Sequence, residues 1–307
     1  MPRLRALLLT VVAVAATAVG PVRAADPLFL VAGRADGALV HVTLVGRVAY
    51  TREVIPAPPS IYHAPTQAVG TRISFTAHTD TQSADRYDVG VADAESNEHR
   101  RLTRDGRSAH LLLSPDGRWR YVLTMGRYGA LTSLVRTDAA GRNRKALVPA
   151  RRTARGDVRL SGTALSPDGR TIYLARTVPG TPSAIYAVDT TTGRLRALPV
   201  PRTYGFVYNV AISPDGRMLA ISYAPTTNFE TTEVAVVRLD GSLVQRFEAT
   251  SNVTASAFTP SGLGVVLTRE LLLLDHHLAG LSIGDLTTGA VQPVAGSAGL
   301  FHAIPIR

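Results

Sequence analysis

The sequence has 307 residues, of which 45% are hydrophobic, and it contains no cysteine, which excludes disulfide bonds, thiol chemistry and lipid attachment at a cysteine. Its 33 lysine and arginine residues outnumber 23 aspartate and glutamate residues, and the formal charge of +10 favours acidic partners. The arginines are scattered and no stacking aromatic residues are interleaved with them, so nucleic acid is not an expected partner.

Residues 1–24 have the pattern of a secretory signal peptide. Arg3 and Arg5 precede an apolar stretch at 7–19, and Val22 and Ala24 stand at the cleavage positions. The stretch is too short to span a bilayer, which argues against the alternative of an uncleaved anchor. We therefore expect cleavage after Ala24, no transmembrane segment after cleavage, and export. The mature protein would be secreted or held in the cell envelope, which is the periplasm if the host has an outer membrane.

One short motif recurs through the rest of the chain. Ser-Pro-Asp-Gly-Arg occurs at 114–118, 166–170 and 213–217, and a degenerate copy stands at 259–262. Each copy lies between two apolar runs and has the residues of a tight turn, because proline presets φ, aspartate bonds the following backbone and glycine accepts positive φ. A second turn with aspartate, and in most units glycine, follows in each unit. The unit is therefore four β-strands, the pattern of a propeller blade.

The spacing of the turns predicts the number of blades. The turn glycines recur every 46 to 52 residues, at Gly117, Gly169, Gly216 and Gly262, and one unit earlier lies Gly70 in a degenerate copy. Before it, 28–31, 38–44 and 47–55 supply only three strands, and 300–306 supplies the missing one. We expect an all-β fold: residues 25–307 form a single domain, a six-bladed β-propeller of four-stranded antiparallel blades. The C-terminal strand closes the first blade and removes its free edge.

The Ser-Pro-Asp-Gly-Arg hairpins resemble the WD-like repeats of exported TolB-like six-bladed propellers, and the resemblance covers nearly all of residues 25–307. It implies a binding protein of the cell envelope. TolB itself carries an additional N-terminal domain, for which we expect no counterpart here. Similar repeats form the propeller of prolyl-oligopeptidase-type peptidases, whose hydrolase domain has a Gly-x-Ser-x-Gly elbow. We expect no such elbow, so the resemblance does not imply that activity.

The channel mouth is the expected binding region, because loops on a rigid scaffold carry function. Arginines in the longer loops would form a basic rim for carboxylates or phosphates; the alternative is the solvated surface of an arginine-rich protein. The ligand-binding residues expected there are Tyr62, Tyr208, Asn209, Arg127, Arg152, Arg155 and Arg202.

Three histidines share one position when the repeats are counted from their turn glycines. His63 and His110 each lie seven residues before one, and His302 lies 47 residues after Ala255, which has the same position. If the three converge on the channel axis, neutral imidazoles could hold a divalent metal. The alternative is that each hydrogen-bonds backbone or trapped water. Asp275-His276-His277 is expected to be a loop tip, since adjacent strand residues point to opposite faces.

Two functions remain open. The first is a monomeric, non-enzymatic binding or scaffold propeller without a cofactor, which recognises an envelope protein, a peptide or an anionic glycan. The second is a metal-dependent lyase or hydrolase acting on an acidic sugar or lactone, with His63, His110 and His302 as metal ligands. No carboxylate is evident at their level, so the base would be a tyrosine, an arginine or metal-bound hydroxide.

Overall fold

The computed structural model describes residues 28–306 except for 46, 57–60, 80–85, 127–129, 201–204, 226–230, 248–251 and 274–275. For residues 61, 62, 79, 252, 269–273, 276–279 and 302 it describes the backbone only. The proposed signal peptide therefore lies outside the described residues. Within the described part of the chain every regular element is a β-strand, and no helix has the length and hydropathy needed to cross a membrane.

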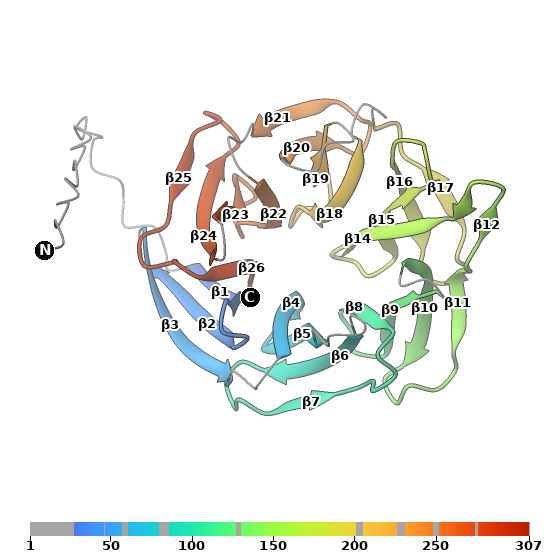
Figure 1. Ribbon diagram of the computed structural model, residues 1–307, viewed down its shortest axis with the longest axis horizontal. Coiled ribbons are helices and arrows are strands. Elements are labelled where there is room, and N and C mark those ends of the chain that lie inside the picture. The colour runs from blue at the N-terminus through green and yellow to red at the C-terminus, as the bar shows by residue number, and fades with distance from the viewer. Residues whose placement is uncertain are drawn as a thin grey trace, which may run out of the picture.

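Six four-stranded antiparallel sheets surround a central channel (Figure 1), which confirms the predicted six-bladed propeller. Blade 1 consists of β26 (Leu300–Pro305), β1 (Leu28–Arg34), β2 (Leu39–Val45) and β3 (Val48–Ile55). Blade 2 consists of β4 (Ile61–Val69), β5 (Arg72–Thr79), β6 (Arg86–Asp93) and β7 (His99–Arg101). Blade 3 consists of β8 (Ser108–Leu113), β9 (Trp119–Met125), β10 (Leu131–Asp138) and β11 (Lys145–Val148).

The second half of the ring repeats this plan, with the first-named strand of each blade innermost. Blade 4 consists of β14 (Arg159–Leu165), β15 (Thr171–Thr177), β16 (Ala184–Asp189) and β17 (Leu195–Ala197). Blade 5 consists of β18 (Phe206–Ile212), β19 (Met218–Ala224), β20 (Glu233–Arg238) and β21 (Leu243–Phe247). Blade 6 consists of β22 (Asn252–Phe258), β23 (Gly264–Leu273), β24 (His276–Asp285) and β25 (Val291–Pro293). A small hairpin, β12 (Arg152–Thr153) and β13 (Gly156–Asp157), lies between blades 3 and 4.

The C-terminal strand closes the ring as predicted. β26 pairs antiparallel with β1, with Arg34 opposite Leu300 and Val31 opposite Ile304. Both ends of the described chain thus contribute to blade 1, and β26 pairs with the edge of β1 that would otherwise be free.

The Ser-Pro-Asp-Gly-Arg turns join the first and second strands of blades 3, 4 and 5 and repeat one hydrogen-bond pattern. In blade 3 the Ser114 hydroxyl donates to Asp116 (2.6 Å), and the Asp116 carboxylate also accepts the backbone N–H of Arg118 (3.0 Å). Gly117 has φ of 69°, a conformation that a Cβ would strain. These turns, with the turns between third and fourth strands, form one end of the ring, which we call the turn face. The opposite end is the loop face.

Apolar side chains pack in six clusters, one at each interface between neighbouring blades. Among the described residues, five clusters contain ten to fourteen buried residues. The cluster between blades 2 and 3 contains three, Val89, Leu111 and Leu113. The ring is therefore held together by contacts between blades, and one of its six joints is much thinner than the others.

Candidate functional site

The channel widens at the loop face into a cavity of about 530 Å³, within the size range of small-ligand pockets. All six blades contribute to its wall. Its described lining includes hydroxyl, amide, imidazole and aromatic groups, and none of the described lining residues is Asp, Glu, Lys or Arg. A second cavity of about 300 Å³ lies at the turn face and shares five wall residues with the first: Thr66, Thr163, Val210, Ser256 and Ile304.

Each inner strand carries a β-bulge, and the bulges shape the cavity wall. Where the register of an inner strand shifts, one residue has no partner across the ladder: Thr66, His110, Gly162, Tyr208 and Ser256. The four of these that have side chains all line the 530 Å³ cavity. A bulge re-aims a side chain, so the bulges direct one residue per strand into the channel in blades 2, 3, 5 and 6.

His110 is the bulged residue of β8 and has φ of 53°, in the left-handed region that non-glycine residues rarely adopt. Its backbone N–H donates to the Thr76 hydroxyl of blade 2 (3.0 Å). Strained backbone of this kind clusters at binding and catalytic sites. His110 is half-buried and lines the cavity. Of the three histidines predicted as metal ligands, it is the one whose described side chain lies in the channel.

Tyr208 and Asn209, both predicted as ligand-binding residues, also line the cavity. The Asn209 amide donates to the carbonyl of Ala255 in blade 6 (2.8 Å), which fixes its side chain across the blade joint. The Tyr208 ring meets Phe206 edge-on at 5.0 Å, and burial raises the pKa of its hydroxyl. The phenol thus stays protonated and can donate a hydrogen bond at neutral pH.

His63 lies elsewhere. Its side chain is 4% exposed between blades 1 and 2, packed edge-on against Phe75, and its Nδ1 donates to the carbonyl of Gly37 (2.8 Å). Burial lowers its pKa and favours the neutral ring. This matches the alternative of a histidine hydrogen-bonded to backbone.

A shortened turn explains why His63 and His110 are not equivalent. In blade 2 the last paired residues are Val69 and Arg72, which enclose two residues, whereas Leu113 and Arg120 of blade 3 enclose six. Three of the four missing residues precede the glycine, so counting from the turn glycine misaligns the inner strands by three residues. The bulge of blade 2 falls at Thr66, not at His63.

The described metal donors fall short of a complete site. The side chain of His302 lies outside the described residues, and only His78 and His110 among the described lining residues are imidazoles. Nowhere in the described part of the chain do three His, Cys, Asp or Glu residues group as metal ligands. Zinc sites use three or four protein ligands. The described residues therefore do not fit a metal.

The predicted arginine rim is only partly described. Arg127, Arg202 and the side chain of Tyr62 lie outside the described residues. Arg152 and Arg155 belong to the β12–β13 hairpin, which lies at the outer edge of the ring (Figure 1), and both are exposed. The structure thus does not bring these two arginines to the channel cavity.

Two wall residues were missed by the sequence reasoning. His78 and Tyr87 are cross-strand partners in blade 2, and their rings stack at 4.6 Å in the cavity wall. The signal for them is weak, since aromatic cross-strand pairs occur throughout sheets. The bulges themselves have no sequence signature in this chain, because the bulged residues differ in type from blade to blade.

The letters Gly-x-Ser-x-Gly do occur, at residues 280–284. Ser282 lies within β24, paired with Leu267 and Pro293, and is 6% exposed. A nucleophile elbow needs a sharp turn between a strand and a helix that exposes the serine. The pentapeptide is therefore part of a sheet and not a catalytic elbow.

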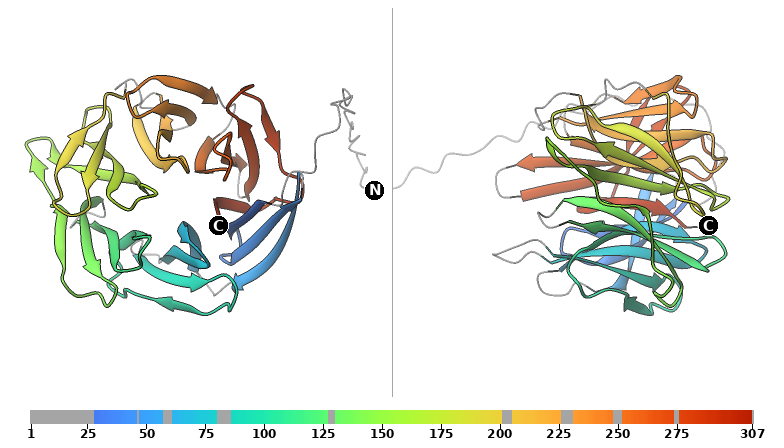
Figure 2. Two further views of the ribbon diagram at one scale, coloured as in Figure 1. Left: turned by 180° about the vertical axis from the view of Figure 1, so that it is seen from behind. Right: turned by 90° about the vertical axis from the view of Figure 1, so that its right-hand side faces the viewer.

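The expected loop around Asp275-His276-His277 is a hairpin. β23 and β24 stay paired as far as Leu273 opposite His276, and Figure 2 shows this hairpin extending from the ring in side view. Asp275 lies outside the described residues, as do both histidine side chains. The backbone on both sides of 274–275 is therefore extended and paired.

No protein-family model matches the chain, and no curated protein matches it significantly. Solved structures do. TolB from Acinetobacter baumannii is 15% identical with a TM-score of 0.64, and the match covers 90% of this chain and 66% of that one. A chain of a nidogen/laminin complex is 13% identical with a TM-score of 0.65, covering 89% and 96%. An oligogalacturonate lyase in complex with manganese is 13% identical with a TM-score of 0.53, covering 84% and 74%. Likeness at these identities shows the shared propeller fold alone.

Proposed function

We propose that this chain is an exported binding propeller that recognises a peptide segment of an envelope protein, or a glycan, at the loop-face mouth of its channel. The observation that carries the proposal is the cavity wall. Tyr208, His110 and Asn209 supply aromatic, imidazole and amide groups, and the described wall holds no charged residue. Such a wall suits hydrogen bonding and stacking to an uncharged ligand surface more than acid–base chemistry.

The comparisons are consistent with binding. One similar structure is a TolB and another belongs to a complex of two proteins, nidogen and laminin. We expect no bound cofactor and a monomeric chain.

The test compares three versions of the purified chain, immobilised and exposed to an envelope extract of its host. Tyr208→Ala combined with Asn209→Ala should lose a component that the wild type retains. Tyr50→Ala is the control, since Tyr50 is 61% exposed on the outermost strand of blade 1. Competition by soluble wild-type chain should release the component. Equal retention by the wild type and the channel variant would contradict the proposal.

Export has its own test. Mass spectrometry of the protein recovered from the medium or envelope should show a mature chain beginning at Ala25. Recovery of the uncleaved chain from the cytoplasm alone would refute export.

A metal-dependent lyase is the second candidate, favoured by the manganese-bound oligogalacturonate lyase among the similar structures and by His110 in the channel. It requires donors beyond the described ones, with His302 first among them. Metal analysis of the purified protein should find about one divalent ion per chain if this candidate holds. Incubation with oligogalacturonate and manganese should then produce the ultraviolet absorbance of an unsaturated product. Metal-free protein that retains its envelope component supports the binding function instead.

A further inference from the structure

The thin joint between blades 2 and 3 departs from the repeat at one strand position. In blades 4, 5 and 6 the first paired residue of the second strand, just after the turn, is Ile172, Leu219 and Val265, respectively. Each is 0% exposed. Blade 3 carries Arg120 at this position. Blade 2 keeps a buried apolar residue there, Ile73, and Arg72 lies one residue before it, on the face of β5 toward blade 3. A charged side chain, Arg120, thus stands where blades 4, 5 and 6 bury an apolar one, and it faces the joint whose cluster is the smallest.

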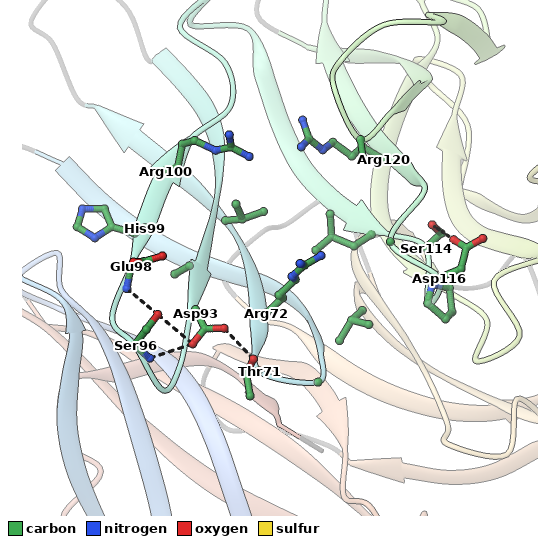
Figure 3. A pocket seen from close by; sticks show the side chains of 18 of the residues that line it. Thr71, Arg72, Asp93, Ser96, Glu98, His99, Arg100, Ser114, Asp116 and Arg120 are labelled. Atoms are coloured by element: carbon green, nitrogen blue, oxygen red, sulfur yellow. Dashed lines mark hydrogen bonds between the residues drawn. The ribbon is translucent and has the colours of Figure 1, made fainter.

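The space left open is a groove of about 1230 Å³ on the turn face. Its walls come from all four strands of blade 2 and from β8, β9 and the turn between them in blade 3. In Figure 3 the guanidinium groups of Arg100, on β7, and Arg120, on β9, extend toward each other across the groove. Arg72 rises between them from β5, and its Nη1 lies 3.5 Å from where a Cβ on Gly117 would stand.

Of the three acidic residues that line the groove, Asp93 and Asp116 are already engaged, and Glu98 is exposed and forms no ion pair with a described residue. Asp93 accepts hydrogen bonds from the Thr71 hydroxyl (2.7 Å) and from the backbone of Ser96 (2.9 Å). Asp116 is held by the Ser114 hydroxyl within its own turn. The two carboxylates therefore close their turns and leave the arginines unneutralised.

The three arginines have no such partners. Among the described residues, no hydrogen bond or ion pair is formed by the guanidinium of Arg72, Arg100 or Arg120. Burial and the charge of Arg100 lower the pKa of Arg120, against the opposing effect of Asp138. Two like charges facing each other are a cost that a bound anion between them would remove.

We propose that this groove binds a ligand with at least two oxyanion groups, one held between Arg100 and Arg120 and a second at Arg72. Guanidinium groups bind carboxylate and phosphate through paired N–H donors, so both chemistries fit. The volume exceeds the range of about 300 to 1,000 Å³ typical of small-ligand pockets, which favours an extended polyanion over a single ion. The site lies at the opposite end of the ring from the channel mouth and does not depend on the function proposed there.

The experiment titrates the full mature chain with pyrophosphate and with citrate by calorimetry at low ionic strength, with glycerol as an uncharged control. Arg120→Leu introduces the residue type that the other blades have at this position. It should weaken binding of the anion by at least tenfold, on the order expected for loss of a charge-assisted hydrogen bond. Arg100→Gln should weaken it similarly. Arg118→Ala is the matched control, because Arg118 is 81% exposed and outside the groove lining.

The melting temperature distinguishes a variant that has lost anion binding from one that has lost its fold. Arg120→Leu should melt at or above the wild-type temperature, since it adds an apolar side chain to the smallest cluster, while the rise that anions cause in the wild type disappears. If only one of the two anions binds, the site is supported, and the result shows whether it takes phosphate or carboxylate groups. The proposal is overturned if neither anion binds, if Arg118→Ala weakens binding as much as Arg120→Leu, or if both groove variants bind like the wild type.

Discussion

The closing strand can be tested by one substitution with a matched control. Leu300 on β26 is 1% exposed and packs in the cluster between blades 6 and 1, with Val40 and Leu281. Leu300→Ala removes buried atoms and leaves a cavity, which costs about 3 kcal/mol. At about 2 to 4 °C per kcal/mol for a domain of this size, the melting temperature should fall by about 6 to 12 °C.

The control is Leu243→Ala. Leu243 is 51% exposed on the outer strand of blade 5, so the same chemical change should alter stability by less than about 0.5 kcal/mol. Differential scanning fluorimetry and urea unfolding report both variants. Equal effects of the two substitutions would refute the claim that β26 is a stabilising closure.

Removing the whole strand is the stronger form of the test. Residues 300–306 include Leu300, Ala303 and Ile304, at 1%, 0% and 7% exposure. Their burial and the ladder to β1 together contribute about 5 kcal/mol or more, comparable to the total of about 5 to 15 kcal/mol typical of a domain. We expect aggregation, visible by size-exclusion chromatography. A truncated chain that melts like the intact one would show that the ring does not need its closure.

Two further predictions concern single side chains. Asp168→Ala should lower stability by about 1 to 2 kcal/mol in urea unfolding, because the carboxylate accepts both the Ser166 hydroxyl and the Arg170 N–H. Those bonds lower the pKa of Asp168. The contribution of Asp168 to stability is therefore complete above the unfolded pKa of about 4 and is lost as pH falls through the lower folded value. A wild-type urea midpoint that is unchanged between pH 7 and pH 3 would contradict this. His63→Ala should destabilise the metal-free protein by about 2 kcal/mol or more, since it empties a buried site and leaves the Gly37 carbonyl without its donor. Burial lowers the His63 pKa, so wild-type stability should fall as pH drops from about 6.5 through the folded value, a dependence the variant should lack; identical melting curves at pH 8 would place the ring in solvent instead.

The fold was predictable because turn chemistry marks each blade. Three copies of Ser-Pro-Asp-Gly-Arg form the same hydrogen bonds, as at Ser114 and Asp116, and their spacing determines the number of blades. The position of the closing strand followed from the missing fourth strand of blade 1. The turn motif and the strand count can both be recognised in short stretches of sequence, and together they are compatible with one arrangement of strands.

The channel site was less accessible from the sequence. A turn shortened by four residues between Val69 and Arg72 shifts the register, and no letter pattern reveals which residue of an inner strand is bulged. Asn209 was predicted because it lies seven residues before Gly216, and Tyr208 because it precedes Asn209; the same counting misplaced His63. The groove has one signal in the sequence, since Arg120 interrupts a position that is apolar in the other repeats, but this signal is recognised only after the strands are aligned correctly.

The uneven packing of the six joints has a consequence for how the ring opens. In a closed ring, separating one pair of blades leaves the other five joints intact, so transient opening occurs where separation costs least. That joint is between blades 2 and 3, where Val89, Leu111 and Leu113 are the only buried members of the described cluster. Amide hydrogens of β7 and β8 should therefore exchange with solvent before those of β26 and β1. Because like charges face each other across this joint, moderate salt should slow that exchange by screening them, whereas salt leaves the apolar joints nearly unaffected. The propeller would then open first between blades 2 and 3 and not at its closing strand, and an anion bound between Arg100 and Arg120 would hold this joint closed.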